Sequence, residues 1–237
     1  IEDLGAYLDE NNSLKADLSS LNGSLRQTGI PGLIPADELS VNLFSGARQL
    51  ADEIENADSG AALGNLYLSS RKLVVSMILG KGDPYTVSLY ISSIADAICR
   101  KALEICIKDA GEPPCRFAFM QTGSAGRREQ TLSTDQDNAI VFENVDAERK
   151  DMVSKYFTGL GKRVNALLSE SGYRLCRGDK MAGNPLWCQP IDRWKQYYSE
   201  WIKTPGPSEL LEMSIFFDFR FCHGDSGLVE ELREYVN

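Results

Sequence analysis

The stretch G-S-A-G-R-R-E-Q-T-L-S-T-D-Q-D-N, residues 123–138, connects two short β-like runs, R-F-A-F-M at 116–120 and N-A-I-V-F at 138–142. A turn of small residues directly after a strand can deliver backbone N–H groups to an anion, and a helix that begins there directs its positive end at the same ligand. Gly123 and Gly126 would let the main chain approach closely. The segment therefore indicates a phosphate-binding turn between two strands.

Polar side chains in this turn add to its attraction for an anion. Ser124 can hydrogen-bond a phosphate oxygen, and Arg127 is a candidate phosphate partner in an otherwise acidic protein. Arg128 is either a second source of positive charge or a solvated surface residue. We expect Glu129 to anchor the turn through Arg127 or a backbone N–H. Because glycine–serine turns are common, this one indicates a specific site only in combination with the acidic residues downstream of it.

Two aspartates come just before the second β-like run. Asp135 and Asp137 are two residues apart, so both side chains point to the same face of an extended segment. Like charges repel unless a cation lies between them. Mg²⁺ is bound in this way by one or two carboxylates, water and substrate phosphates. The alternative is a solvated Asx-rich turn before a strand, but the upstream glycine–serine turn favours a two-metal nucleotidyl-transfer site.

Apolar periodicity predicts helices along most of the remaining chain. We expect them at 45–57, 61–79, 87–106 with a stop at Gly111, 147–171, 194–202, 209–221 and from residue 227 onward. A third short β-like run lies at 173–176. A small sheet flanked on both sides by helices indicates an α+β fold.

The N-terminal region has a different character. Residues 3–25 fit a heptad register with the polar Asn11 at one a position, a pattern typical of two-stranded coiled coils. A single amphipathic helix that packs on its own domain is the equal alternative. Residues 28–40, rich in glycine and proline, predict a linker or an ordered loop. Because the chain begins at Ile1 within this helical pattern, we expect it to be a fragment of a longer protein.

Composition narrows the classes of function. The 237 residues carry 25 Lys and Arg against 34 Asp and Glu, a net charge of −9, which argues against general nucleic-acid binding. No apolar run approaches the roughly 18–20 residues of a membrane span. The six cysteines form no C-x-x-C pair and His223 is the single histidine, which argues against a zinc site. We expect a cytoplasmic protein without a membrane partner.

Residues 123–141 resemble the glycine–serine and D-x-D signature of the DNA polymerase beta superfamily of nucleotidyltransferases. More narrowly, the stretch is similar to the protein-PII uridylyltransferase-like nucleotidyltransferase domain. The run M-A-G-N-P at 181–185 with Trp187, and F-D-F-R at 217–220, resemble later blocks of the same family. The resemblance covers about residues 45–237.

This resemblance implies a small mixed, polymerase-beta-like sheet between N-terminal and C-terminal helical bundles. It implies a connecting helix and linker at 1–42 and a nucleotidyltransferase-like domain at 43–190. Within that domain, 43–115 would be a helical lead-in and 116–190 would hold the sheet and the motif. Residues 191–237 would be a truncated, helical substrate-binding domain.

The resemblance also implies an activity: transfer of a nucleoside monophosphate from a nucleoside triphosphate to an acceptor, a regulatory protein, with two Mg²⁺ ions. Gly123 and Ser124 would hold the triphosphate, with Arg127 as a phosphate partner, and Asp135 and Asp137 would hold the metals. Family members occur in bacterial signal-transduction proteins behind CBS or cyclic-nucleotide-binding domains. The same resemblance implies an upstream sensor domain, with residues 1–25 as the connecting helix. The heptad pattern, and not the resemblance, indicates a homodimer through residues 3–25.

The sequence departs from the superfamily pattern at one point. A third carboxylate usually comes from a later strand, and the run at 173–176 contains none. Asp179 is the nearest acid, on an expected loop. Asp192 is a further alternative, as is Asp218, which we expect within a helix and paired with an arginine, either Arg220 or one from the core. Without a third acid, the same domain would be a nucleotide-sensing or dimerising output module.

Five aromatic side chains lie downstream of the motif. We expect them to form the core of the C-terminal helices, with a base-stacking platform beside the nucleotide as the alternative. They are Trp187, Trp194, Tyr197, Tyr198 and Trp201. His223 is expected at a helix end with no ligand role.

Overall fold

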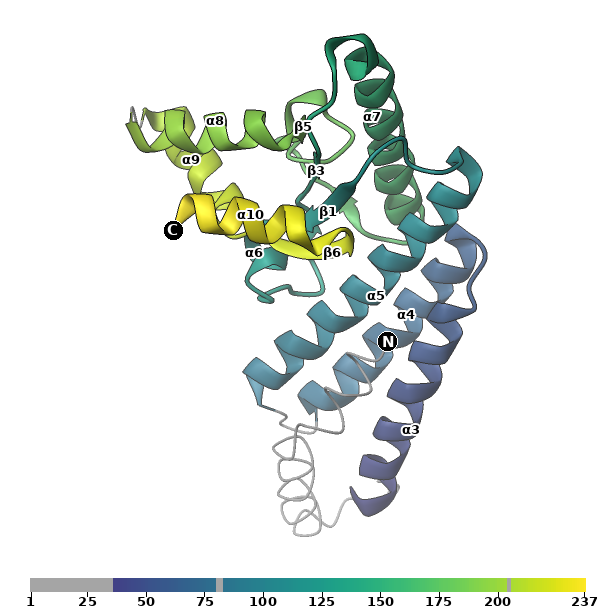
Figure 1. Ribbon diagram of the computed structural model, residues 1–237. Helices are drawn as coiled ribbons and strands as arrows, with labels where there is room; N and C mark the ends of the chain where they lie inside the picture. Colours follow the sequence, from purple (N-terminus) through teal and green to yellow (C-terminus); the bar gives the residue numbers. More distant parts are fainter. Residues whose placement is uncertain (1–35, 80–82, 204–205) are drawn as a thin grey trace. The chain divides into compact units, whose positions relative to one another are not determined.

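The computed structural model describes residues 36–79, 83–203 and 206–237 (Figure 1). The chain divides into two compact units, residues 1–98 and 99–237. The heptad segment at 3–25 and its pairing lie outside the described residues. None of the described helices combines the length and the apolar character needed to cross a membrane.

The first unit contains a pair of packed helices, α3 (Ala36–Glu55) and α4 (Gly60–Leu79). They pack where Gly46 of α3 faces the side chain of Leu73. Helix α3 begins before the predicted residue 45, so the predicted linker at 28–40 is wrong for residues 36–40. The sequence places two acids, Asp37 and Glu38, in the first turn, where they favour a helix N-terminus.

Helix α5 (Pro84–Ala110) begins in the first unit and ends in the second. Asp83 caps it by accepting a 2.8 Å hydrogen bond from the backbone N–H of Thr86. The predicted stop is confirmed, because Gly111 has a left-handed φ of 82° and its N–H donates to the carbonyl of Ile107 at 2.9 Å.

The second unit carries the remaining strands and helices. They are β1 (Phe117–Gln121), α6 (Gly123–Gly126), β2 (Asp135–Gln136), β3 (Asn138–Phe142), α7 (Ala147–Glu170), β4 (Arg174–Leu175), the 3-10 turn η1 (Pro185–Trp187), β5 (Cys188–Pro190), α8 (Ile191–Lys203), α9 (Pro207–Phe216), β6 (Arg220–Gly224) and α10 (Ser226–Val236). This mixture of helices around a small sheet confirms the α+β fold.

The main sheet has four strands in the order β5-β3-β1-β6. Strand β1 runs antiparallel to both β3 and β6, and β3 runs parallel to β5. In the central pair, Phe117 lies opposite Phe142 and Gln121 lies opposite Asn138. Strands β2 and β4 form a separate parallel pair.

The predicted helix at 209–221 is wrong at its C-terminal end. Helix α9 ends at Phe216, and β6 joins the edge of β1. The apolar run at 215–222 fits a strand as well as a helix, and hydrogen bonding to β1 decides in favour of the strand. Asp218 therefore lies in the turn between α9 and β6, and His223 lies in a strand and not at a helix end.

The expected division at residues 190/191 also differs from the structure. Strand β6, from the region expected to form a separate C-terminal domain, pairs with β1 in the same sheet. Helices α8, α9 and α10 contribute to one core with β1 and β3. The reason is that one face of the sheet would otherwise expose its apolar side chains.

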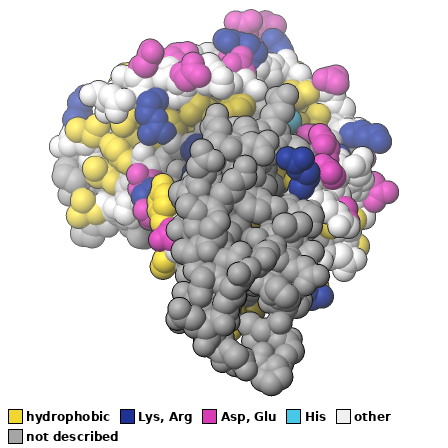
Figure 2. Space-filling model, turned by 90° about the horizontal axis from the view of Figure 1, so that it is seen from below, with side chains coloured by type: hydrophobic (Ala, Val, Ile, Leu, Met, Phe, Trp, Pro, Cys, Tyr) yellow, Lys and Arg dark blue, Asp and Glu magenta, His cyan; other side chains and the backbone are white. Residues whose placement is uncertain are grey.

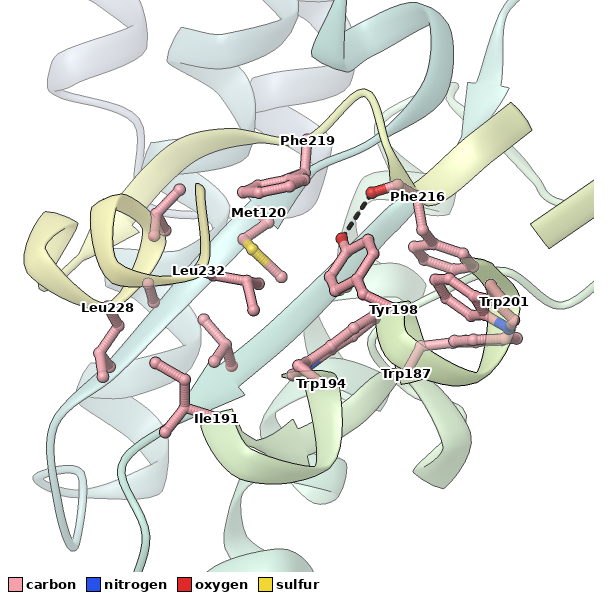
Figure 3. Close-up of a cluster of buried hydrophobic side chains, with 14 residues drawn as sticks. Met120, Trp187, Ile191, Trp194, Tyr198, Trp201, Phe216, Phe219, Leu228 and Leu232 are labelled. Atoms are coloured by element: carbon pink, nitrogen blue, oxygen red, sulfur yellow. Dashed lines mark hydrogen bonds between the residues drawn. The ribbon is translucent and has the colours of Figure 1, made fainter. Parts of the chain in front are cut away.

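Helices cover both faces of the sheet (Figure 1). On one face, Phe157 of α7 packs against Phe117 and Phe142, with ring centroids 5.1 and 5.0 Å apart. The other face meets α8, α9 and α10 (Figure 3). Because both faces are covered, every residue of β1 and β3 is buried, in agreement with their continuous apolar runs.

The aromatic side chains downstream of the motif belong to this second core. Trp187, Trp194, Tyr198 and Trp201 are buried, and Tyr197 packs against them. This burial confirms the predicted core and does not support the base-stacking alternative. Two buried polar atoms of the cluster have partners: the indole N–H of Trp194 donates to the carbonyl of Ile140 at 3.0 Å, and the hydroxyl of Tyr198 donates to the carbonyl of Phe216 at 2.6 Å (Figure 3). The indole N–H of Trp187 is buried with no hydrogen-bond partner among the described residues.

Replacing Tyr198 by phenylalanine should destabilise the second unit by about 1–3 kcal/mol, because the carbonyl of Phe216 would stay buried without a donor. The matched control is Tyr235→Phe, which removes an exposed hydroxyl that pairs with Ser199 and should change stability by no more than about 0.5 kcal/mol. Urea-induced unfolding followed by tryptophan fluorescence measures both. If both variants lost the same unfolding free energy, the buried hydrogen bond of Tyr198 would not be the cause of the loss.

Candidate functional site

The register of β1 and β3 brings the glycine–serine turn to the two aspartates. Just beyond the pair Gln121–Asn138, the backbone N–H of Thr122 donates to the carbonyl of Asp137 at 3.1 Å. Gly123 comes next with a left-handed φ of 57°. A Cβ atom at Gly123 would lie 3.4 Å from Oδ2 of Asp137. The carboxylate of Asp137 therefore lies directly against the turn.

The turn itself is shorter than expected. Helix α6 is a single turn of four residues, and it closes with hydrogen bonds from Gly126 N–H to Thr122 O and from Arg127 N–H to Gly123 O. The first N–H groups of any helix lack partners inside the helix. The donors that this turn could offer to an anion are therefore those N–H groups and the hydroxyl of Ser124, without the dipole of a long helix.

The segment before and within β6 supports this turn from behind. A Cβ atom at Gly126 would lie 1.9 Å from the carbonyl oxygen of Asp218, so only glycine permits this approach. The guanidinium of Arg220 donates to the carbonyl of Ala125 at 2.9 Å. In front, Ile215 of α9 lies near Gly123. The block F-D-F-R at 217–220 stands out in the sequence, but the contacts of Asp218 and Arg220 with this turn were not predicted from it.

Arg127 is held by two acids. Its Nε donates to Glu129 at 2.8 Å and its Nη1 to Asp218 at 2.6 Å. These hydrogen bonds raise the pKa of Arg127. The prediction that Glu129 anchors the turn through Arg127 is confirmed. Asp218 does pair with an arginine, but its partner is the exposed Arg127 and not Arg220, whose guanidinium donates to Ala125 instead. Arg128 is exposed with a left-handed φ of 57°.

Asp135 and Asp137 point to the same side of the chain because Gln136 and Asn138, which alternate with them in sequence, are buried on the opposite side. The amide of Gln136 donates to the carbonyls of Asn165 and Tyr173, at 3.2 and 3.1 Å. Asn165 of α7 donates in turn to Gln136 and to Asn138, both at 3.0 Å. This buried amide network, which the sequence analysis missed, fixes the direction of Asp135 and Asp137.

Electrostatics at Asp137 fit a bound cation. Burial raises the pKa of Asp137, and the charge of Asp135 raises it further, against a hydrogen bond from the Cys176 thiol and the charge of Lys180. Its Oδ1 atom is buried and has no hydrogen-bond partner among the described residues. Two mutually repelling carboxylates with an unpaired oxygen are a donor set that suits Mg²⁺.

The third carboxylate does not join this pair. Asp179 has a left-handed φ of 53°, and its carboxylate accepts a 2.9 Å hydrogen bond from Asn184. Within the described ranges, no three acidic, cysteine or histidine side chains are arranged to hold a metal ion. Asp192 lies in the first turn of α8, and Asp218 pairs with Arg127.

The loop after β4 reaches the site because α7 lets it approach. The carbonyl of Lys180 accepts from Asn138 N–H at 3.1 Å, and Ala182 N–H donates to the side chain of Asn138 at 2.9 Å. Gly161 of α7 makes this possible, since a Cβ atom there would lie 2.2 Å from the carbonyl oxygen of Ala182.

Gly161→Ala should therefore destabilise the protein by about 1–3 kcal/mol, because the loop backbone would have to move. Gly159 lies two residues away in the same helix, and a Cβ there meets only the flexible end of Arg163 at 3.8 Å. Gly159→Ala should stabilise by up to about 1 kcal/mol through helix propensity. Urea midpoints of both variants test the contrast, and a Gly161→Ala protein as stable as the parent would disprove the contact.

The raised pKa of Asp137 predicts how stability depends on pH in the absence of divalent metal. A carboxyl with a folded-state pKa above its ordinary 3.8 binds more protons when folded, so stability falls as the pH rises through the raised pKa. Asp137→Asn removes this loss. In EDTA, the variant should melt at a higher temperature than the parent near pH ~7.5, and the gap should narrow near pH ~4.5. Asp151→Asn, exposed on α7, should show no such gap.

Charged side chains elsewhere are mixed in sign. On the face seen in Figure 2, Lys and Arg alternate with Asp and Glu over the described residues and form no continuous basic area. Arg116 is one of the cations that pair with acids, since it lies 2.9 Å from Glu143 and 3.3 Å from Asp225.

Comparison with known proteins gives one finding. The model of a family described as "Putative nucleotidyltransferase DUF294" matches residues 69–208. The matched region contains the glycine–serine turn, both aspartates and the loop that carries Lys180. A search of the curated proteins finds no match.

Proposed function

This chain belongs to that nucleotidyltransferase family, and on this basis we propose that it transfers a nucleoside monophosphate from a nucleoside triphosphate to an acceptor in a Mg²⁺-dependent reaction. The observation that carries the proposal is the position of the Asp137 carboxylate against Gly123, with Asp135 close enough to raise its pKa. The turn proposed to bind phosphate and the two carboxylates proposed to hold the metal therefore lie next to each other.

The proposed reaction breaks the bond between the α-phosphorus and the oxygen that bridges to the β-phosphate. An acceptor hydroxyl forms the new bond to the α-phosphorus and releases its proton to solvent water, and pyrophosphate leaves. Gly123 and Ser124 hold the phosphates through backbone N–H groups and a hydroxyl, and Asp135 and Asp137 hold the metal. Two bound Mg²⁺ ions would lower the pKa of the attacking hydroxyl and neutralise the leaving group.

We propose a regulatory protein as the acceptor, with uridylyl or adenylyl as the transferred group. The resemblance of residues 123–141 to the protein-PII uridylyltransferase-like domain supports this acceptor class. The same resemblance supports a role in bacterial signal transduction behind an upstream sensor domain.

A second candidate function is a nucleotide-sensing module with slow or no transfer. One observation favours it: Asp179 is engaged by Asn184 and does not complete a three-acid group with Asp135 and Asp137. Such a module would bind the Mg²⁺–nucleotide complex at the same turn and pass the signal to the rest of the chain.

Mg²⁺ and one nucleoside triphosphate together should raise the melting temperature of the parent protein. A ligand at ~100 times its dissociation constant stabilises the folded state by about 2.7 kcal/mol. The measurement is thermal unfolding with ATP, UTP, GTP or CTP, each with and without Mg²⁺. Asp137→Asn should lose the shift because it removes a metal ligand, whereas Asp151→Asn should keep it.

The outcome separates the candidates. No shift with any nucleotide would overturn both functions. If a nucleotide binds, the same compound labelled at the α-phosphate and, separately, at the γ-phosphate is incubated with the protein and a cell extract. Nucleotidyl transfer labels an acceptor from the α-position alone, and Asp137→Asn abolishes the label. Binding without transfer would favour the sensing module.

A further inference from the structure

A largely buried lysine lies beside the proposed metal ligands. The side chain of Lys180 is 13% exposed and forms an ion pair with Glu212 of α9, itself 18% exposed. Its ammonium also lies 4.7 Å from the ring centroid of Trp187, on the face of the indole. A buried ammonium needs such partners, because its loss of hydration is costly.

A backbone hydrogen bond fixes the position of Lys180 relative to β3. The carbonyl of Lys180 accepts from Asn138 N–H at 3.1 Å, so the lysine lies at the start of β3 beside Asp137. The charge of Lys180 lowers the pKa of Asp137, opposing the effect of burial. Lys180 is therefore near the carboxylate that lies against Gly123.

Helix α9 reaches the same place from the other side. Ile215 lies near Gly123, and Glu212 is one helical turn earlier. One carboxylate oxygen of Glu212 pairs with Lys180, while the other is buried with no hydrogen-bond partner among the described residues. The turn, Asp137, Lys180 and Glu212 thus form one continuous group.

A triphosphate bound at this place would need a nearby protein cation, because the acids around it are negatively charged. A triphosphate brings several negative charges to a place that already holds Asp135, Asp137 and Glu212. The guanidinium of Arg127, the cation expected from the sequence, is already paired with two carboxylates, Nε with Glu129 and Nη1 with Asp218, so its charge is balanced within the turn. An ammonium has three donors, and Glu212 and the face of Trp187 account for two directions around Lys180.

We propose that Lys180 binds the β- and γ-phosphates of the nucleoside triphosphate and that Glu212 holds its ammonium in place from α9. This assignment rests on the proposed function and deepens it, since it moves the role of phosphate cation from Arg127 to a residue the motif does not contain. In the transfer reaction, Lys180 neutralises charge on the leaving pyrophosphate, and no proton needs to move.

The test compares ligands with and without the polyphosphate. Isothermal titration with Mg²⁺ present measures the affinity of the parent, Lys180→Met and Lys180→Arg for the triphosphate identified by thermal shift, for its monophosphate and for inorganic tripolyphosphate. Lys180→Met should bind the triphosphate and tripolyphosphate about 10- to 100-fold more weakly, as expected for a lost charged hydrogen bond. Its affinity for the monophosphate should change by less than about threefold, and Lys180→Arg should restore most of the loss.

A second variant guards against a folding defect. Lys180→Met leaves Glu212 buried without its partner, whereas Lys180→Gln combined with Glu212→Gln replaces the ion pair by two neutral amides. The double variant should show the same selective loss for polyphosphate ligands.

Three results would overturn the assignment. If the parent binds the triphosphate, Asp137→Asn abolishes binding and Lys180→Met binds like the parent, then the proposed function stands and Lys180 has no phosphate role. An equal loss for triphosphate and monophosphate would make Lys180 structural. If the parent binds neither the triphosphate nor tripolyphosphate, the proposed function fails together with the assignment.

Discussion

The antiparallel pairing of β1 with β3 is the constraint on which the site depends. With Gln121 opposite Asn138, the chain leaves β1 at the point where it enters β3, and the glycine–serine turn meets Asp137. A shift by one residue would exchange the two faces of β3. Asp137 would then replace Asn138 in the buried amide network, and its carboxylate charge would be buried without a partner.

The C-terminal elements complete this arrangement and are not an appendage. Strand β6 adds to the free edge of β1, Arg220 and Asp218 support α6 from behind, and Glu212 of α9 pairs with Lys180. Residues far apart in the chain thus determine the positions of a few donors around Gly123. Their common cause is the apolar face of the sheet, which the aromatic cluster of α8, α9 and α10 buries.

Sequence patterns correctly predicted those features of the fold that depend on residues close together in the chain. The limits of β3, the end of α5 at Gly111 and the α+β class result from short apolar runs, a helix stop and the alternation of elements. The turn and the aspartates were found because their chemistry is contiguous in sequence. Strand β6 was missed because its conformation depends on pairing with β1. Lys180 was missed, and the contact of Arg220 with Ala125 was not foreseen, because the partners of both cations are distant in the chain.

Strand β6 is synthesised long after the motif that it supports. The turn and both aspartates leave the ribosome about 80 residues before the strand that braces them, and domains fold as units during synthesis. A nascent chain that ends before residue 218 carries the whole motif but lacks Asp218, Arg220 and the outer strand. The motif is therefore complete in sequence well before the contacts of Asp218 and Arg220 that support its turn can form.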